Sequence, residues 1–227
     1  KSPGGPRAYV DLVRDGVMDV APFLPGAIPG RFLTYKVVEF PFSTGTNAET
    51  TSVAYWRVYQ KHLAKADEHK GVKLLTVWTH GPGVLHNSKR PVEKIADIKG
   101  LKLRVPSEAI GSVAREVGAV PLLVPISQVH DILSKGTADG LFTPFNAVLD
   151  FKLGKILRYS TTVKGGVYNL AFHFIMNQKK WASLTKSEQA AIEKFSGEAG
   201  ARLMGAAWDR GDKAGIKYAT DNGMKIS

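Results

Sequence analysis

The stretch Ala96-Asp97-Ile98-Lys99-Gly100-Leu101-Lys102-Leu103-Arg104-Val105-Pro106 carries the strongest structural signal in this chain. Apolar and basic residues alternate over 101–105, and this period of two predicts a strand with the two leucines on one face. From 107 to 118 the apolar residues recur at helix spacing, so a helix is expected to follow the proline. Arg104 is therefore predicted to lie at the carboxyl end of a strand, just before a helix.

This placement makes Arg104 a candidate binding residue. In open α/β sheets, ligands bind outside the carboxyl ends of the strands. A planar guanidinium at that edge suits bidentate capture of a carboxylate or phosphate. An ordinary ion pair at a domain edge is the alternative interpretation of the same pattern. Ser107, the first residue of the predicted helix, is included among the candidate binding residues.

The composition bounds the class of protein. The chain has 227 residues, 44% of them hydrophobic, which is enough for one large domain or two lobes with a core. No segment approaches the roughly 20 apolar residues that a membrane-spanning helix needs. The absence of cysteine excludes disulfides, thiolate metal sites and cysteine catalysis. Residues 1–5 lead directly into a helical pattern without a signal peptide, so we expect the chain to be truncated or processed.

The net charge of +11 raises the question of an anionic partner. The 31 Lys and Arg residues are spread along the chain, and no run of five or six like charges occurs. No nucleic-acid-binding motif accompanies them. We therefore expect a solvated basic surface and no nucleic-acid partner.

Strand and helix patterns alternate along the chain, which predicts an α/β fold. The expected strands are 19–23, 72–79, 101–105, 121–125, 139–143, 156–163 and 168–176. The expected helices include 47–70, 107–118 and 127–136, with Ser127 as an N-cap, and a Thr185–Glu188 capping box opens the C-terminal helices.

A sequence pattern that occurs twice in the chain suggests two lobes. Residues 12–20 (LVRDGVMDV) resemble residues 132–140 (ILSKGTADG), and each reads as a helix, a glycine stop, an aspartate and a buried strand. Two α/β units of one plan predict two lobes that face each other across a cleft, where small ligands tend to bind. The alternative is that helix–glycine–strand is a common connection in any α/β protein.

The known catalytic motifs are missing: there is no G-x-S-x-G, P-loop, H-E-x-x-H or G-x-G-x-x-G after a strand. His80 and His86 flank a Gly-Pro-Gly turn and carry the alternative of an enzyme that uses them as acid and base. Metal ligation by this pair lacks a third ligand, so neither a metal nor a cofactor is expected. His173 is expected in the core, and His69 in solvent.

Aromatic residues near strand ends suggest an apolar pocket. Trp78 lies near the end of the strand 72–79, Phe145 follows 139–143, and Tyr168 opens 168–176. Core packing is the alternative for each, and Phe142 is expected in the core. An arginine with aromatics at several strand ends fits an organic acid with an apolar body.

Several motifs together resemble the DctP family, the solute-binding proteins of TRAP transporters. These are 97–106 (DIKGLKLRVP), 118–121 (GAVP), 125–129 (PISQV), 133–140 (LSKGTADG) and the early loop from 25 to 42. The resemblance covers nearly the whole chain. Compared with family members, the chain is expected to lack the first strand and helix, and also the last helix.

The resemblance implies a periplasmic, two-lobed binding protein of α/β class rather than an enzyme. It implies lobe I over 1–81 with about 170–207, incomplete at its N-terminal part, and lobe II over 82–169 with about 208–227. The lobes would close on a small organic acid and deliver it to the TRAP membrane subunits. The sequence does not indicate an oligomeric state.

The resemblance also assigns candidate residues. The family's carboxylate-clamping arginine falls on Arg104. The family often has Asn where this chain has Thr143, and Asn146 is the expected substitute. Leu24 would border the cleft, and the turn 81–85 lacks the second arginine that many members carry. Together these features imply a monocarboxylate: a 2-oxo, 2-hydroxy or aromatic acid. The full candidate set is Leu24, Trp78, His80, Arg104, Ser107, Thr143, Phe145, Asn146 and Tyr168.

Overall fold

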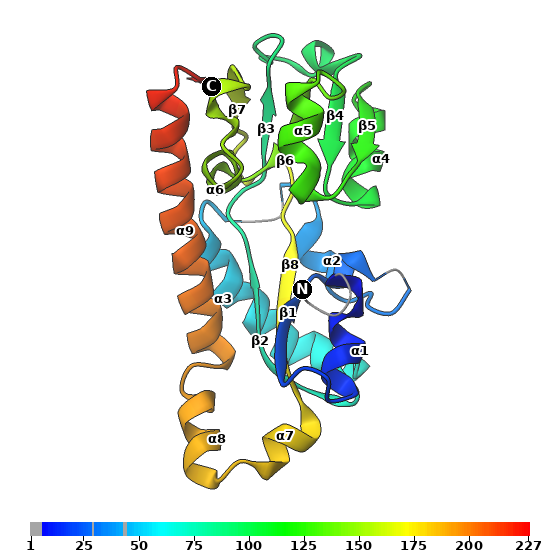
Figure 1. The fold of residues 1–227 in the computed structure, drawn as a ribbon, viewed down its shortest axis with the longest axis vertical. Coiled ribbons are helices and arrows are strands. Elements are labelled where there is room, and N and C mark those ends of the chain that lie inside the picture. Colours follow the sequence, from blue (N-terminus) through cyan, green and yellow to red (C-terminus); the bar gives the residue numbers. More distant parts are fainter. Residues whose placement is uncertain (1–5, 29, 43–44) are drawn as a thin grey trace. The chain divides into compact units, whose positions relative to one another are not determined.

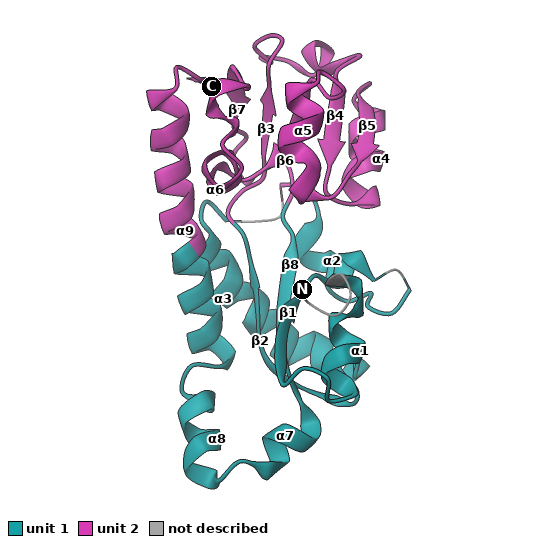
Figure 2. Ribbon diagram, viewed as in Figure 1, with its two compact units in different colours: residues 1–40, 45–80, 169–207 teal, residues 41–44, 81–168, 208–227 magenta. Residues whose placement is uncertain are grey.

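The computed structural model of the protein describes residues 6–28, 30–42 and 45–227, and these form two compact units. Unit 1 comprises the described residues within Lys1–Phe40, Gly45–His80 and Asn169–Ala207, and unit 2 those within Pro41–Thr44, Gly81–Tyr168 and Trp208–Ser227 (Figure 2). The chain passes between the units several times, so neither unit is one continuous segment. The lobes expected from the sequence change after residues 81, 169 and about 207, and the two units change after residues 80, 168 and 207.

Unit 1 is built on a sheet whose described strands have the order β1-β8-β2, all antiparallel. The strands are β1 (Val20–Phe23), β8 (Ala171–Asn177) and β2 (Val72–Thr79). The helices are α1 (Tyr9–Arg14), α2 (Lys36–Glu39), α3 (Ala48–Val58), α7 (Gln178–Ser183) and α8 (Lys186–Glu193). The central strand β8 contributes buried residues to the hydrophobic core together with α1 and β2.

Unit 2 contains a mixed sheet with the strand order β5-β4-β6-β3-β7-β9 among its described residues. The strands are β3 (Val84–Asn87), β4 (Lys102–Val105), β5 (Val120–Leu123), β6 (Gly140–Thr143), β7 (Tyr159–Thr161) and β9 (Lys225–Ile226). The helices are α4 (Glu108–Glu116), α5 (Val129–Ser134) and α6 (Phe145–Asp150) (Figure 1). The long helix α9 (Gly197–Asp221) supplies residues to both units.

The repeated sequence forms the same local structure in each unit. Gly16 follows α1 with φ +80°, and Gly136 follows α5 with φ +69°, a region that favours glycine. The amide of Gly16 donates to the Val13 carbonyl at 3.2 Å, and that of Gly136 to the Leu133 carbonyl at 3.1 Å. Each turn then leads into a strand, β1 in unit 1 and β6 in unit 2. The expectation of one helix–glycine–strand plan used twice is confirmed.

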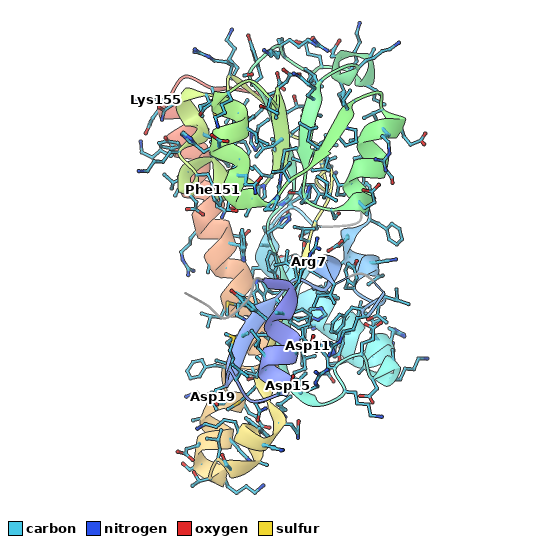
Figure 3. All side chains as sticks on the ribbon, turned by 45° about the vertical axis from the view of Figure 1, so that its right-hand side comes forward. Arg7, Asp11, Asp15, Asp19, Phe151 and Lys155 are labelled. Atoms are coloured by element: carbon cyan, nitrogen blue, oxygen red, sulfur yellow. The ribbon has the colours of Figure 1, made fainter. Side chains whose placement is uncertain are left out.

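The acidic residues near the first copy pair locally. Asp11, Asp15 and Asp19 follow one another along α1 and the turn into β1 (Figure 3). Arg14 and Arg31 bind the Asp11 carboxylate at 2.8 and 2.6 Å. Such partly exposed ion pairs contribute little to stability, and here two basic side chains share one acidic neighbour.

In the part of the chain that the structure describes, no helix is long and apolar enough to cross a membrane.

Two expected strands are shorter in the structure. β8 begins at Ala171 rather than 168, because the Asn169 side chain takes over the local hydrogen bonding: it donates to the His80 carbonyl and accepts from the Leu170 amide. Only 159–161 of the expected strand 156–163 is extended. The carbonyl of Leu153 accepts from the amides of residues 156 and 157, which forms a helical turn there instead.

Two helix expectations also need correction. Ser127 lies inside a 3₁₀ turn, Ile126–Gln128, and α5 begins after it without a side-chain cap. The helix expected over 47–70 passes from α3 into a π-helical turn and a 3₁₀ turn and ends at Ala66, where Asp67 adopts a left-handed conformation. The capping box of Thr185 and Glu188 is confirmed.

Candidate functional site

The position of Arg104 follows from three parallel strands of unit 2. β4 pairs in parallel with β5 and with β6, and Arg104 stands opposite Leu122 and Leu141. The carboxyl ends of parallel neighbours meet at one edge of a sheet. Arg104, near the end of β4, and Thr143, at the end of β6, therefore share that edge. The prediction that Arg104 ends a strand just before a helix is confirmed.

The Arg104 guanidinium is buried, with 5% of the residue exposed. Its Nε donates to the Val124 carbonyl at 2.8 Å and its Nη1 to the Phe142 carbonyl at 3.4 Å. No acidic side chain lies within 4.0 Å of it in the described residues. Burial lowers the pKa of Arg104 from its usual value, although the hydroxyl of Tyr168 opposes this effect. The ion-pair interpretation therefore finds no support here, and a buried cation bonded only to carbonyls remains.

A buried guanidinium without a carboxylate is costly, because it has lost its water and gained no counter-charge. Carbonyl dipoles hold its orientation but do not neutralise it. Only two of its five donors have protein acceptors in the described residues. The arrangement can therefore accept an anion with oxygen atoms.

The turn that follows β6 carries the next candidates. Pro144 ends the strand, and α6 begins at Phe145. Asn146 donates from Nδ2 to Asp150 at 3.1 Å, and because a carboxylate only accepts, this bond defines the orientation of the amide. The Oδ1 atom of Asn146 is buried and has no hydrogen-bond partner within the described part of the chain. An oxygen acceptor is thus left available beside the sheet edge.

The aromatic candidates of unit 2 lie in different surroundings. Tyr168 is 1% exposed, and its ring centre is 6.4 Å from that of Phe142 in an edge-on arrangement. The carbonyl of the same Phe142 accepts from Arg104, so Tyr168 and Arg104 share Phe142 as a neighbour. Phe145 lies in the core of unit 2, with its ring centre 5.0 Å from that of His86. Phe142 is buried, as expected.

Ser107 caps the helix after Arg104. Its Oγ accepts from the amide of Ile110 at 3.5 Å, and the residue is half-buried. The cap fixes the start of α4 at Glu108, three residues after β4 ends at Val105.

Three candidates belong to unit 1. Trp78, near the end of β2, stacks on Phe172 of β8 with ring centres 5.5 Å apart. The ring of His80 lies edge-on to the same phenylalanine at 6.3 Å. The Nε1 atom of Trp78 is buried, with no hydrogen-bond partner among the residues described. Leu24 is half-buried and precedes the 3₁₀ turn Pro25–Ala27.

His86, one of the two residues behind the enzyme alternative, is occupied inside unit 2. Its Nε2 is 3.1 Å from the Thr143 carbonyl, and its Nδ1 is 2.7 Å from Ser160 Oγ. The carbonyl can only accept, so Nε2 carries the proton and Nδ1 accepts from the serine hydroxyl. Burial lowers the pKa of His86 to about 4. Both nitrogens are engaged, which leaves neither available for acid–base chemistry.

Sequence reasoning missed two residues of this region. Phe172 brings Trp78 and His80 together, yet the register of β2 against β8 that does so cannot be derived from either strand alone. Asp212, from the middle of α9, accepts a hydrogen bond from the backbone N–H of Asn146 at 2.8 Å. The cluster Gly211-Asp212 with Gly215 in an otherwise helical stretch was the available signal.

Comparisons with known proteins identify the family of this chain. The model of the bacterial extracellular solute-binding protein family 7, DctP, matches residues 1–227. Over 202 residues the chain is 32% identical to the outer membrane transporter protein TsaT of Comamonas testosteroni, covering 88% of this chain and 59% of that protein. The chain spans 59–66% of the length of the first curated relatives that it matches.

Two solved structures are similar throughout the chain. A TRAP periplasmic solute-binding protein from Bordetella bronchiseptica, with bound (R)- and (S)-mandelate, has 39% identity and a TM-score of 0.91, over 100% of this chain and 71% of that one. A TRAP solute-binding protein from Rhodoferax ferrireducens T118, in complex with benzoate, has 33% identity and a TM-score of 0.90, over 98% and 69%.

Proposed function

We propose that this chain, which belongs to the DctP family of extracellular solute-binding proteins, binds a small aromatic or 2-hydroxy monocarboxylate and presents it to a TRAP transporter in the periplasm. The observation that carries the proposal is the buried Arg104 guanidinium, which lacks an acidic partner in the described residues. The ligand's carboxylate would be that partner. The family's members are solute-binding proteins rather than enzymes.

The geometry favours recognition of the carboxylate by Arg104. A carboxylate accepts two parallel hydrogen bonds from one guanidinium, and Nη1 and Nη2 retain the donors for it. Because the site is buried, the attraction is stronger than between the same charges in water. The carbonyls of Val124 and Phe142 orient the guanidinium before the ligand arrives. This preorganisation reduces the entropy lost on binding.

A hydroxyl on the ligand has a candidate partner in Asn146. Its Oδ1 is buried without a partner in the described residues, and it accepts but cannot donate. A 2-hydroxy acid or a hydroxylated aromatic acid would satisfy that acceptor, whereas a 2-oxo group would not. The mandelate bound by the Bordetella relative is both aromatic and a 2-hydroxy acid, which supports the proposed class.

The apolar part of the ligand needs a wall. Tyr168 packs edge-on against Phe142, whose carbonyl accepts from Arg104, and Thr143 ends the same strand as Phe142. The benzoate bound by the Rhodoferax relative supports an aromatic body. The contributions of Trp78, His80, Leu24, Ser107 and Phe145, and the closure of the lobes, stay predictions.

The test is a binding panel on the protein and on Arg104→Ala. Benzoate, mandelate and 3-hydroxybenzoate would be compared with succinate and galacturonate by thermal shift and isothermal titration. A ligand at 100 times its Kd stabilises the folded protein by about 2.7 kcal/mol, a readable shift. Arg104→Ala should lose about 2–5 kcal/mol of binding free energy, because the ligand's charge is left unpaired.

Arg115→Ala is the matched control, since Arg115 lies in the same unit but is exposed and pairs with Glu108. It should bind like the parent. Equal affinity of Arg104→Ala and the parent for the same acid would contradict the role of Arg104. Tight binding of succinate or galacturonate alone would contradict the proposed ligand class.

A further inference from the structure

Helix α9 approaches the start of α6 unusually closely within unit 2. A Cβ atom at Gly215 would lie 2.1 Å from the Phe145 carbonyl oxygen, so no other residue fits there without movement. A Cβ at Gly211 would lie 3.1 Å from the Cβ of Asn146. These two glycines are one helical turn apart and create the space between the helices. Asp212 lies between them in the sequence and is brought against the first turn of α6.

The Asp212 carboxylate caps α6 from outside that helix. Its Oδ1 accepts from the backbone amide of Asn146 at 2.8 Å, and the backbone amide of Phe145 also lowers the pKa of the carboxyl group. The first amides of a helix have no partner within the helix, and the residue in the N-cap position here, Pro144, offers no capping side chain. Asp212 therefore replaces the local cap.

The same carboxylate reaches a second segment. A Cβ atom at Gly81 would lie 2.0 Å from Asp212 Oδ2, which shows how close this oxygen comes to the chain just after β2. The side chain thus touches both the start of α6 and the segment that leads toward Gly83. A Cβ at Gly83 would in turn lie 2.2 Å from the Tyr168 ring. One carboxylate links the surroundings of Asn146 with those of Tyr168.

The turn between β6 and α6, residues 143–146, is held from both sides. On the β6 side, the Phe142 carbonyl accepts from Arg104 and the Thr143 carbonyl from His86. On the α6 side, the backbone amide of Asn146 donates to Asp212. Without Asp212 the turn would be fixed only at its β6 end.

A carboxylate is a costly choice for this purpose. Burial raises the pKa of Asp212 to about 6, even though two amides stabilise its charge, and the nearby carboxylates of Asp209 and Asp150 add to the rise. A neutral serine or asparagine in the N-cap position would cap a helix without burying a charge. A cap in the N-cap position would not join α6 to α9, whereas Asp212 does, so its side chain fixes where the turn lies.

We propose that Asp212 is a positioning residue of the carboxylate site: by holding the backbone amide of Asn146 at the start of α6, it places Thr143 and the Asn146 acceptor against the ligand bound to Arg104. This inference rests on the proposed function. Nothing in it requires Asp212 to touch the ligand.

The experiment compares Kd and stability for Asp212→Ala, Asp212→Asn and the parent. Isothermal titration with benzoate and with mandelate is done well below the melting temperature, where circular dichroism shows each variant folded. Asp212→Ala should bind mandelate about tenfold more weakly or worse, because small displacements of positioning groups cost affinity steeply. Asp212→Asn keeps an acceptor oxygen and should remain within about threefold of the parent. Benzoate, which lacks the hydroxyl, should lose less than mandelate.

Asp221→Ala is the control on the same helix, since Asp221 is exposed and, among the described residues, forms an ion pair only with Lys217; it should bind like the parent. If Asp212→Ala does not fold, Gly211→Ala tests the same turn by pushing on Asn146, and it should weaken mandelate binding severalfold. A folded Asp212→Ala with the parent's Kd overturns the inference, as does an Asp212→Asn variant as weak as the alanine variant. A parent that binds neither acid instead overturns the proposed function.

Discussion

The Nε2 atom of His69 lies 2.8 Å from the Nδ1 atom of His173 in the core of unit 1. Two tyrosines extend this hydrogen bond into a network of four side chains. Tyr59 Oη is 3.1 Å from His69 Nδ1, and Tyr55 Oη is 2.8 Å from His173 Nε2. Each buried imidazole nitrogen thus has a partner, and both histidines are neutral. His173 is a core residue as expected, whereas the expectation that His69 is solvated is wrong.

Because these two histidines are buried and neutral, we expect the protein to lose stability in acid. Burial lowers the pKa of His69 to about 4, and that of His173 well below its usual value. Between about pH 6.5 and 4 the unfolded chain binds protons that the folded chain refuses, so the free energy of unfolding falls as the pH falls through this range. At about 1.4 kcal/mol per pKa unit, His69 alone accounts for about 3 kcal/mol.

Urea unfolding of the parent and of His69→Gln at pH 7.5, 6 and 4.5 checks this expectation. The variant should show a shallower decline with acid. His62→Gln is the matched control, because His62 is exposed on the same segment, and its decline should equal that of the parent. Equal slopes for His69→Gln and the parent would contradict the assignment.

Glu39 should have the opposite pH dependence. It is 6% exposed, accepts from the Ala171 amide at 3.1 Å, and burial raises its pKa to about 7. Since the folded state holds this proton more tightly than the unfolded state, its stabilising effect is complete below about pH 4.5 and is lost as the pH rises through 7. Glu39→Gln should therefore be more stable than the parent at pH 8, by up to about 3 kcal/mol.

The measurement is the difference in unfolding free energy between Glu39→Gln and the parent at pH 5 and 8. The glutamine oxygen can still accept from the Ala171 amide, so the difference reports the charge. A difference that does not grow with pH would argue against a buried, protonated Glu39. Glu116→Gln, on the exposed side of α4, is the control. Glu68→Gln is unsuitable, because the Glu68 carboxylate accepts hydrogen bonds from Leu33 and Thr34.

Arg104 should lower stability in the absence of ligand. Its guanidinium is buried without an acidic partner in the described residues, and replacing even a buried ion pair by apolar side chains of similar volume is often neutral or stabilising by about 1–4 kcal/mol. Arg104→Met leaves two carbonyls without this donor, so we expect the lower end, about 1 kcal/mol. The ligand-induced thermal shift should disappear in the same variant. A less stable ligand-free Arg104→Met would show that the guanidinium is mainly structural.

Gly83 tests the placement of Tyr168. An alanine Cβ would lie 2.2 Å from the Tyr168 ring, and the Gly83 amide donates to the Tyr168 carbonyl at 2.9 Å. Gly83→Ala must displace the ring and should lose about 1–3 kcal/mol of stability together with ligand affinity. Gly111→Ala, in the interior of α4 where the new methyl meets only ordinary contacts, should gain about 0.5–1 kcal/mol. Unchanged binding by a folded Gly83→Ala would separate Tyr168 from the site.

Local patterns predicted much of unit 2 because its elements are short and strongly patterned. The alternation over 101–105 and the spacing after Ser107 identified β4 and α4, and so the strand-end position of Arg104. The strand expected from residue 168 was wrong at its start, because Asn169 bonds to a carbonyl 89 residues away in the sequence. His69 was misplaced for the same reason: its partner His173 is 104 residues away.

The sequence by itself determined the alternating α/β pattern, the repeated helix–glycine–strand turn and the arginine at a strand end. These follow from side-chain periodicity and from backbone conformations that glycine allows, which are properties of neighbouring residues. Only the tertiary structure decided that Arg104 is buried among carbonyls, that His86 is fully engaged and that Asp212 reaches α6. Burial and hydrogen bonding between distant segments depend on which elements pack together, and packing sets both the cost of a charge and the identity of its partner.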